Sequence, residues 1–218
     1  MFTFTTDSAV DVFVKDLEAA HVKCIPLTYT VNGQTYRDIA EDDSSYIKFY
    51  DELKAGAMPV TSQINPYEHE EFWEQVYAEE KRDIVHLSLS GGLSKTYASA
   101  CQAAESFNSK HDDAKVYVVD SIGATQAEAP IYEKALVLRD EGVDAATAAE
   151  TLRNYAHRIQ VYIIADDLFH LKRGGRVSAA AAVVGSMFSI KPVIVFDDEG
   201  HLCVYKKPVG WKKALKTV

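Results

Sequence analysis

The chain has 218 residues, 47% hydrophobic and 25% charged, which is enough to bury a sizeable core in one large domain or two small ones. Its 32 acidic residues outnumber the 23 basic ones and give a formal net charge of −9, which argues against sequence-independent binding of nucleic acid. The three cysteines are widely spaced and form no CxxC pair, which excludes a disulfide scaffold and a zinc ribbon.

The first predicted strands lie near the N-terminus. Phe2–Thr5 and Cys24–Val31 are rich in β-branched and aromatic residues, which is typical of strands. The second segment ends at Asn32-Gly33, a turn pair typical of two-residue hairpins. We therefore expect Gln34–Tyr36 to return as its short hairpin partner.

The next predicted element is a helix whose N-terminal capping residues can be recognised in the sequence. Asn65 is a cap residue, Pro66 suits the first helical position, and Glu68 completes a capping pattern. Its apolar stripe consists of Phe72, Trp73, Val76 and Tyr77. These features predict an amphipathic helix that packs one face on a core.

Strand and helix patterns then alternate along the chain. Further strands are predicted at Ile84–Leu89, Val116–Val119, Val161–Ala165, Pro192–Phe196 and Leu202–Tyr205. Further helices are predicted at Ser94–Phe107, Gln126–Asp140 and Asp144–Ile159. Apolar strands separated by helices are typical of an α/β fold with a mostly parallel sheet covered by helices on both faces.

The pattern changes near residue 160. A glycine loop, an alanine-rich helix and two strands joined by the hairpin signal Asp197–Gly200 replace the earlier alternation. We therefore expect an α/β parallel-sheet domain over residues 1–160 and a second, incomplete α/β domain over residues 161–218.

Hydroxyl-rich loops occur at three places, Thr6-Asp7-Ser8, Thr61-Ser62-Gln63 and Ser88–Thr96. Ligands of open α/β sheets bind where strand ends meet helix N-termini with unpaired N–H groups. In the third loop, Gly91-Gly92 lets the backbone approach a ligand and Ser94 stands at the helix start. This loop suits a carboxylate or phosphate, with an ordinary helix cap as the alternative.

No enzyme motif accompanies these loops. The third loop lacks the spacing of a phosphate-binding P-loop and the second glycine of a nucleophile elbow. The histidines have no metal-ligand spacing; His86 is interpreted as a core residue, and His69, His111 and His157 as solvated. A Ser–His–Asp triad stays open because its members lie far apart along a chain.

A second distinctive loop is basic in an otherwise acidic chain. Arg173 and Arg176 flank Gly174-Gly175, which suits contact with an anion or docking onto an acidic partner. A surface loop whose arginines pair with Asp166 or Asp167 is an equal alternative.

The sequence also predicts a cytoplasmic location. Its cysteine usage suits a reducing compartment, and Met1–Asp7 has neither the basic region nor the apolar core of a signal peptide. The longest weakly polar stretch, Ser178–Ile190, is too short to cross a bilayer. This excludes an integral membrane protein and leaves peripheral contact with a membrane open.

Several of these segments form a specific pattern in order along the whole chain. They are Thr6-Asp7-Ser8-Ala9, Ile25-Pro26-Leu27 with Gly33-x-x-Tyr36-Arg37-Asp38, Pro59-x-Thr61-Ser62-Gln63, Leu93-Ser94-x-Thr96-Tyr97-x-Ser99-Ala100, Asp120-Ser121 and Leu171-Lys172-Arg173-Gly174-Gly175-Arg176. The pattern resembles the DegV family of bacterial lipid-binding proteins, which includes the fatty-acid-binding subunits of fatty acid kinase.

The resemblance implies a two-domain α/β fold that holds one long-chain fatty acid between its domains. It implies that Thr61 and Ser94 hold the carboxylate, with Ser62, Ser90 and Gly91 as second candidates. A separate ATP-dependent kinase subunit would phosphorylate the bound acid to an acyl phosphate. The chain itself would carry and present the lipid, without a cofactor and without chemistry of its own.

Two features depart from the family pattern. Lys95 stands where the family motif has glycine, so it either adds charge at the head group or points to solvent. The sequence has no counterpart for a later His-Thr-Gly-Pro-Gly segment, which in the family contributes a histidine to the carboxylate network. Either the chain is a truncated form, or it is a shortened member with an incomplete second domain.

Two other functions stay open beside the lipid carrier. Ser94 would serve as the nucleophile of a serine hydrolase or acyltransferase, or the same crevice would bind another small anion such as a phosphosugar or nucleotide. Ala179–Val184 with Ile190, Val193 and Ile194 would line a lipid tunnel or, equally, form plain core.

Overall fold

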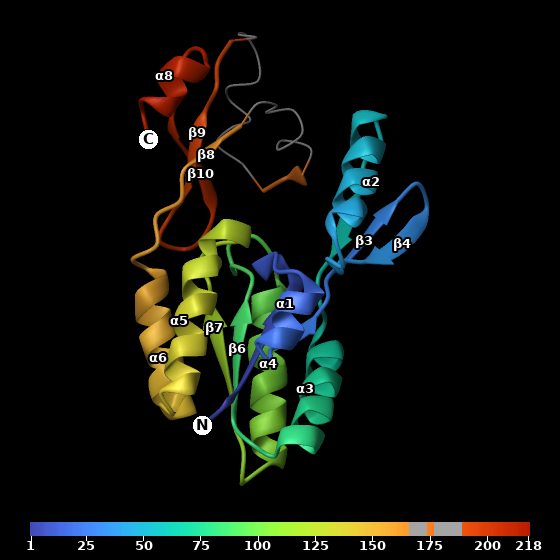
Figure 1. Cartoon of the computed structure of the whole chain (residues 1–218), viewed down its shortest axis with the longest axis vertical. Helices are drawn as coiled ribbons and strands as arrows, with labels where there is room; N and C mark the ends of the chain where they lie inside the picture. Colours follow the sequence, from blue (N-terminus) through green and yellow to red (C-terminus); the bar gives the residue numbers. More distant parts are fainter. Residues whose placement is uncertain (166–173, 177–188) are drawn as a thin grey trace.

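The computed structural model describes residues 1–165, 174–176 and 189–218; the predictions for Arg173 and Ala179–Val184 lie outside these residues. A four-stranded parallel sheet in the order β2-β1-β6-β7 forms the centre of the larger part (Figure 1). Its strands are β1 (Thr3–Asp7), β2 (Lys23–Ile25), β6 (Ile84–Ser88) and β7 (Val116–Asp120). The predicted parallel sheet is confirmed.

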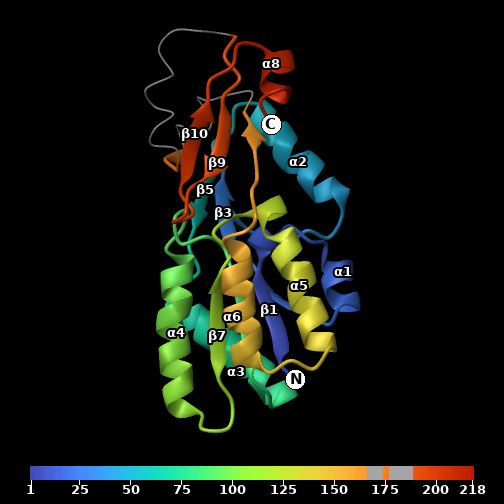
Figure 2. The same cartoon turned by 90° about the vertical axis from the view of Figure 1, so that its left-hand side faces the viewer.

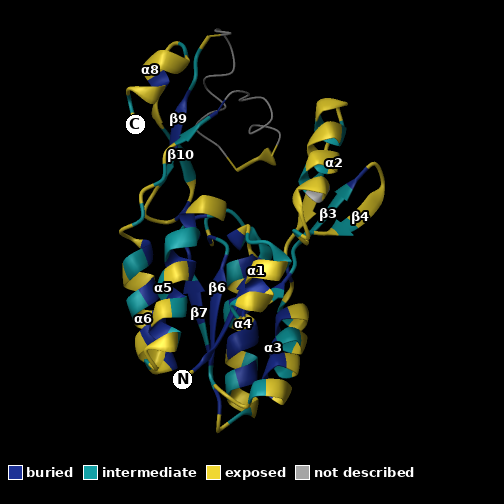
Figure 3. Cartoon of the chain, viewed as in Figure 1, coloured by how far each residue is buried: buried dark blue, intermediate teal, exposed yellow. Residues whose placement is uncertain are grey.

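Helices cover both faces of this sheet (Figure 2). Alternate strand residues point to opposite faces, so that Val85 and Leu87 join one core and Ile84 joins the other. The strands β1 and β6 in the middle of the sheet are buried throughout, whereas Lys23 of the edge strand β2 is exposed (Figure 3). The first core is closed by α1 (Val14–Ala19), α5 (Ala129–Asp140) and α6 (Ala145–Ala156), and the second by α3 (Pro66–Glu80) and α4 (Thr96–Lys110). Short 3₁₀ turns, η1 (Ser8–Val10) and η2 (Thr125–Ala127), follow β1 and precede α5.

A separate lobe stands beside the carboxyl end of the parallel sheet (Figure 1). It consists of an antiparallel sheet in the order β4-β3-β5 and the helix α2 (Asp43–Lys54). Its strands are β3 (Thr28–Val31), β4 (Gln34–Arg37) and β5 (Val60–Ser62). The sequence analysis predicted the β3–β4 hairpin and missed α1, α2 and β5.

The prediction of one continuous strand over Cys24–Val31 is wrong. The segment divides into β2, which pairs in parallel with β1, and β3, which pairs antiparallel with β4 and β5. Pro26 lies between them and has no N–H to donate to a sheet, so the ladder is interrupted there. The break sends the chain from the central sheet into the lobe.

A third sheet forms the C-terminal part of the described chain. Its order is β10-β9-β8, with β8 (Ile163–Ile164), β9 (Val193–Phe196) and β10 (Leu202–Lys206), and α8 (Trp211–Leu215) follows. The hairpin predicted at Asp197–Gly200 joins β9 and β10. The predicted domain boundary at residue 160 lies in the connection between α6 and β8.

The tip of this hairpin rests directly on the loop after β6. The Ser90 hydroxyl donates to the Gly200 carbonyl at 3.0 Å. A Cβ placed on Gly92 would lie 2.4 Å from the Gly200 carbonyl carbon and 2.6 Å from the Glu199 carbonyl oxygen. The two backbones therefore approach more closely than any side chain at position 92 allows.

Two buried histidines pack between α3 and the sheet. His86 is fully buried as predicted, and its Nδ1 lies 2.9 Å from the Thr5 hydroxyl. The prediction that His69 is solvated is wrong, because its position on the first turn of α3 places the ring against Trp73 and His86. Burial lowers the pKa of His69 to about 4 and holds the pKa of His86 well below its usual range.

The first prediction concerns the hairpin contact. Gly92→Ala is expected to lower the unfolding free energy by about 1–3 kcal/mol, because backbone atoms have to move to admit the new methyl group. Chemical denaturation measures the change. Gly174→Ala is the matched control, since no atom of the described residues lies within 4 Å of its Cβ position. Equal stability of the two variants would refute the close contact.

A second prediction follows from His69. Between about pH 6.5 and pH 4 the unfolded chain binds more protons at this residue than the folded chain, so the folded state loses stability as the pH falls through this window. Without the titrating ring, His69→Phe should lose less unfolding free energy than the wild type when the pH falls from 6.5 to 4, by up to about 3 kcal/mol. Urea titrations at several pH values test it, with His157→Phe on the exposed end of α6 as control. Parallel pH profiles for wild type and His69→Phe would contradict the prediction.

Candidate functional site

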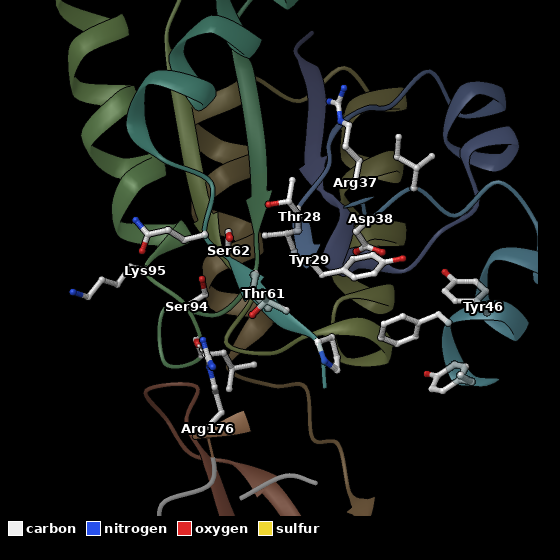
Figure 4. A pocket seen from close by; sticks show the side chains of 18 residues that line it. Thr28, Tyr29, Arg37, Asp38, Tyr46, Thr61, Ser62, Ser94, Lys95 and Arg176 are labelled. Carbon is white, nitrogen blue, oxygen red and sulfur yellow. Dashed lines mark hydrogen bonds between the residues drawn. The ribbon is translucent and has the colours of Figure 1, made fainter. Parts of the chain in front are cut away.

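A large cavity lies where the lobe meets the carboxyl end of the parallel sheet (Figure 4). It measures about 760 Å³ and is called the main cavity here. Its walls come from Leu27, Thr28, Tyr29, Arg37, Asp38, Ile39, Tyr46, Phe49, Tyr50, Pro59, Thr61, Ser62, Gln63, Leu89, Leu93, Ser94, Lys95 and Arg176. Hydroxyl, cationic and aromatic side chains thus line one space.

Thr61 and Ser62 enter the main cavity from β5. The register of β5 against β3 sets Thr61 opposite Tyr29 and Ser62 opposite Thr28. Both residues are exposed, and their hydroxyls hydrogen-bond to no other residue within the described parts of the chain. They are therefore available to a ligand.

Ser94 enters from the loop between β6 and α4. Its backbone N–H donates to the Ser90 carbonyl at 3.1 Å, which closes a tight turn. Its hydroxyl oxygen accepts from the Thr96 N–H at 3.1 Å and lies 2.9 Å from the Thr96 hydroxyl. Ser94 thus stabilises the start of α4 and lines the cavity at the same time (Figure 4).

Thr96 joins the two hydroxyl loops, a role that sequence analysis missed. Its buried hydroxyl contacts Ser94 on one side and accepts from the Ile64 N–H at 3.3 Å on the other. Gln63 adds a second link, since its Nε2 donates to the Ser99 hydroxyl at 3.4 Å. The only sequence signal was a hydroxyl two residues after Ser94, which is common at helix starts.

Ser90 and Gly91 do not line the main cavity. The Ser90 hydroxyl is buried, donates to the Gly200 carbonyl and accepts from the Gly92 N–H. The Gly91 N–H donates to the Asp120 carboxylate at 3.2 Å. These two residues therefore shape the loop that carries Ser94.

Of the predicted basic loop, Arg176 reaches the main cavity. Its Nε donates to the Leu93 carbonyl at 3.4 Å and its Nη1 to the Gly174 carbonyl at 2.6 Å. Lys95 is exposed at the rim, on the side of Ser94 away from Tyr46 (Figure 4). Both cations stand near the hydroxyl end of the cavity.

Aromatic side chains form a further wall of the main cavity, and Tyr29 in this wall is the cross-strand neighbour of Thr61. The Tyr29 ring stacks on Tyr36 at 5.4 Å between ring centroids and meets Phe49 edge-on at 5.1 Å. Phe49 in turn meets Tyr50 edge-on at 5.5 Å. Burial raises the pKa of both Tyr29 and Tyr46, so this wall is uncharged at neutral pH.

The first hydroxyl segment lies behind the main cavity. Asp7 accepts from the Leu89 N–H at 2.8 Å and from the Ala9 N–H at 3.0 Å. Burial raises its pKa to about 6, although these hydrogen bonds oppose the shift. Asp7 therefore anchors the loop after β6.

Val193 and Ile194, named as tunnel residues, are buried in β9 and do not line the main cavity.

The described residues contain neither a histidine paired with Ser94 nor a metal centre. None of the described histidines hydrogen-bonds to Ser94, whose hydroxyl contacts Thr96. No group of three or more metal-ligating side chains in residues 1–165, 174–176 and 189–218 is placed to hold a metal ion. Over the same residues, none of the helices has the length and apolar character needed to cross a bilayer.

The chain is similar to known proteins over its whole length. The DegV family model matches residues 1–218. A DegV domain-containing protein of Streptococcus pyogenes serotype M3 is 34% identical over 215 residues, which cover 99% of this chain and 75% of that protein. For the DegV domain-containing protein YteA of Lactococcus lactis the identity is 35%, over 98% of this chain and 74% of YteA. The chain therefore belongs to the DegV family.

Solved structures share the fold. A fatty-acid-binding DegV family protein from Thermus thermophilus has a TM-score of 0.83 at 29% identity, over 99% of this chain and 74% of that chain. DegV of Bacillus subtilis, a fatty acid binding protein, has a TM-score of 0.78 at 28% identity, over 99% and 74%. These matches confirm the predicted α/β fold, and this chain spans about three quarters of the length of these relatives.

The third prediction tests the link between the two loops. Thr96→Val keeps the side-chain shape but leaves the Ile64 N–H without an acceptor, so we expect the unfolding free energy to fall by about 1–3 kcal/mol. Thr96→Ser keeps the hydroxyl and is expected to retain most of the stability. Denaturant titration compares the two. A serine variant as unstable as the valine variant would show that the methyl group, and not the hydroxyl, matters.

Proposed function

We propose that this chain binds a long-chain fatty acid in the main cavity, with the carboxylate at Thr61, Ser62 and Ser94 and the alkyl chain along the aromatic wall. The observation that carries this proposal is the combination, in one cavity, of hydroxyls from two loops with apolar rings. The fatty-acid-binding relatives support the same ligand class.

The head-group end suits a carboxylate. Thr61 and Ser62 offer hydroxyl donors without a competing partner among the described residues, and Ser94 adds a third from the opposite loop. Hydrogen bonds to a charged group contribute about 1.5–3 kcal/mol each. Arg176 and Lys95 supply positive charge at the rim, which a negatively charged protein needs in order to attract an anion.

The apolar wall supplies most of the affinity. Each buried methylene contributes about 0.8 kcal/mol, so a sixteen-carbon chain contributes on the order of 10 kcal/mol before association costs. A phosphosugar would leave the aromatic wall, formed by Tyr29, Phe49 and Tyr50, without an apolar partner. This wall therefore favours a lipid over a phosphosugar, whereas the base of a nucleotide would stack on such rings.

We further propose that the chain is a carrier and not an enzyme. A serine nucleophile needs a base within hydrogen-bond reach, and the Ser94 hydroxyl is paired with Thr96 instead. By resemblance to its family, the chain would present the carboxylate in the cytoplasm to a separate ATP-dependent kinase subunit, which would form the acyl phosphate.

The fourth prediction tests the head-group site. Thr61→Val and Ser94→Ala each remove one hydrogen bond to the carboxylate, so each is expected to weaken fatty-acid binding about tenfold to a hundredfold. Delipidated protein is titrated with palmitate by calorimetry. Thr151→Val and Ser109→Ala, whose hydroxyls bond to carbonyls of their own helices, are matched controls.

Three results would contradict the proposal. The first is native mass spectrometry that detects no C14–C18 acid bound to protein purified from bacteria. The second is an unchanged affinity for palmitate in both Thr61→Val and Ser94→Ala. The third is covalent labelling of Ser94 by a fluorophosphonate, together with burst release from an activated ester. The last would establish the hydrolase alternative instead.

A further inference from the structure

The hydroxyl segment Thr6-Asp7-Ser8 does not line the main cavity, yet it holds three residues that do. The segment runs from the carboxyl end of β1 into η1. Its side chains hydrogen-bond to Leu27 and Asp38 on the side of the lobe and to Leu89 on the side of the parallel sheet. The segment therefore contacts both halves of the site from behind.

Ser8 holds the lobe at its base. Its hydroxyl donates to the Asp38 carboxylate at 2.8 Å and accepts from the Leu27 N–H at 3.0 Å. Leu27 comes directly before β3 and Asp38 directly after β4, and the Asp38 N–H donates to the Leu27 carbonyl at 2.8 Å. One hydroxyl thus joins both ends of the β3–β4 hairpin to η1.

The base of the hairpin lies close to the head-group hydroxyls of the lobe. The residue after Leu27 is Thr28, which pairs with Ser62, and the residue after that pairs with Thr61. Backbone hydrogen bonds fix the register of antiparallel strands, so a displacement at Leu27 also displaces both hydroxyls of β5. Ser8 therefore helps to set where these hydroxyls stand.

Asp7 holds the other half of the site. Its carboxylate accepts from the Leu89 N–H at 2.8 Å, where β6 passes into the loop that carries Ser94. Asp7 and Ser8 are neighbours in the chain, and their Cα atoms are only about 3.8 Å apart. The points that hold the two halves of the site are therefore covalently joined.

The lobe is held at two edges. Ser8 holds the base of β3 and β4, and Thr96 holds the segment between β5 and α3. Without the two bonds at the first edge, the lobe stays attached at Thr96 and by the 2.7 Å bond from Tyr46 to Asp11, and it is free to turn about these contacts. Such a turn changes the distance from the β5 hydroxyls to Ser94.

We propose that Ser8 is a positioning residue of the fatty-acid site, which keeps Thr61 and Ser62 at the distance from Ser94 that a carboxylate requires. This inference rests on the proposed function. It gives the first hydroxyl segment a role that needs no contact with the ligand. A lobe that occupies the binding position for only part of the time binds an acid with an affinity reduced by that fraction.

Ser8→Ala tests the role of the hydroxyl. Palmitate binding to delipidated protein, measured by calorimetry, should weaken about tenfold, as expected for a lobe that occupies the binding position about one tenth of the time. Amide exchange followed by NMR should be faster at Leu27 and unchanged at Leu89, which Asp7 still holds. Ser8→Thr keeps the hydroxyl, and a cavity of about 380 Å³ beside Ser8 has room for the added methyl group, so this variant should retain most of the affinity.

Asn108→Ala is the matched control. The Asn108 side chain also makes two hydrogen bonds, since it accepts from the Val116 N–H at 2.7 Å and donates to the Val116 carbonyl at 3.0 Å. These bonds join the last part of α4 to the start of β7, away from the main cavity. The variant should lower the denaturation midpoint as Ser8→Ala does and leave palmitate affinity unchanged.

The wild type gives a readout that does not depend on the folding of any variant. Palmitate at about ten times its dissociation constant should slow exchange of the Leu27 N–H about tenfold, because this N–H is released when the lobe leaves the binding position. An unchanged exchange rate, wild-type affinity in Ser8→Ala, or equal weakening in Asn108→Ala would overturn this inference alone. Wild-type protein that binds no palmitate would overturn the proposed function and this inference with it.

Discussion

One buried hydroxyl fixes the geometry of the site. Thr96 lies at the start of α4. Its hydroxyl oxygen accepts a hydrogen bond from the Ile64 N–H, which precedes α3, and it also contacts the Ser94 hydroxyl. A buried N–H without a partner costs about 1–3 kcal/mol, so the two loops are held in one relative position. Because Thr61 and Ser62 precede Ile64 by only a few residues, that position also sets the distance between the hydroxyls on either side of the main cavity.

The same end of the sheet holds two buried carboxyl groups. Asp7 and Glu128 are both buried there, and burial raises the pKa of each, with the neighbouring Asp7 charge adding to the effect on Glu128. Asp7 is offset by N–H donors from Leu89 and Ala9. A pKa of about 6 leaves Asp7 mostly ionised at neutral pH, so an anionic ligand at this end needs compensating donors. Thr61, Ser62 and Ser94 offer hydroxyl donors in the main cavity, and Arg176 and Lys95 add positive charge.

Sequence patterns predicted the regular part of the fold and much of the site. Strand and helix periodicity located the parallel sheet and its covering helices, and Thr61, Ser62, Ser94 and Arg176 all reach one cavity. The lobe was missed in part because the apolar side chains of α2 do not join either hydrophobic core of the described residues, and Ile47 and Tyr50 are exposed. The contact between Gly92 and Gly200 joins residues more than a hundred positions apart, and no local pattern encodes such a pairing.

The cavity is assembled from two sheets, and both carry proposed head-group hydroxyls. Ser94 belongs to the loop that follows β6, a strand that is buried along its whole length, whereas Thr61 and Ser62 belong to β5 of the antiparallel lobe. The aromatic wall belongs to the antiparallel lobe, where Tyr29 and Phe49 are only partly covered. Head-group contacts depend on exact placement of donors, whereas apolar burial is non-directional and tolerates small shifts. Substitutions at Tyr29 or Phe49 thus change which chains fit, whereas substitutions at Thr96 disturb the placement of the hydroxyl donors.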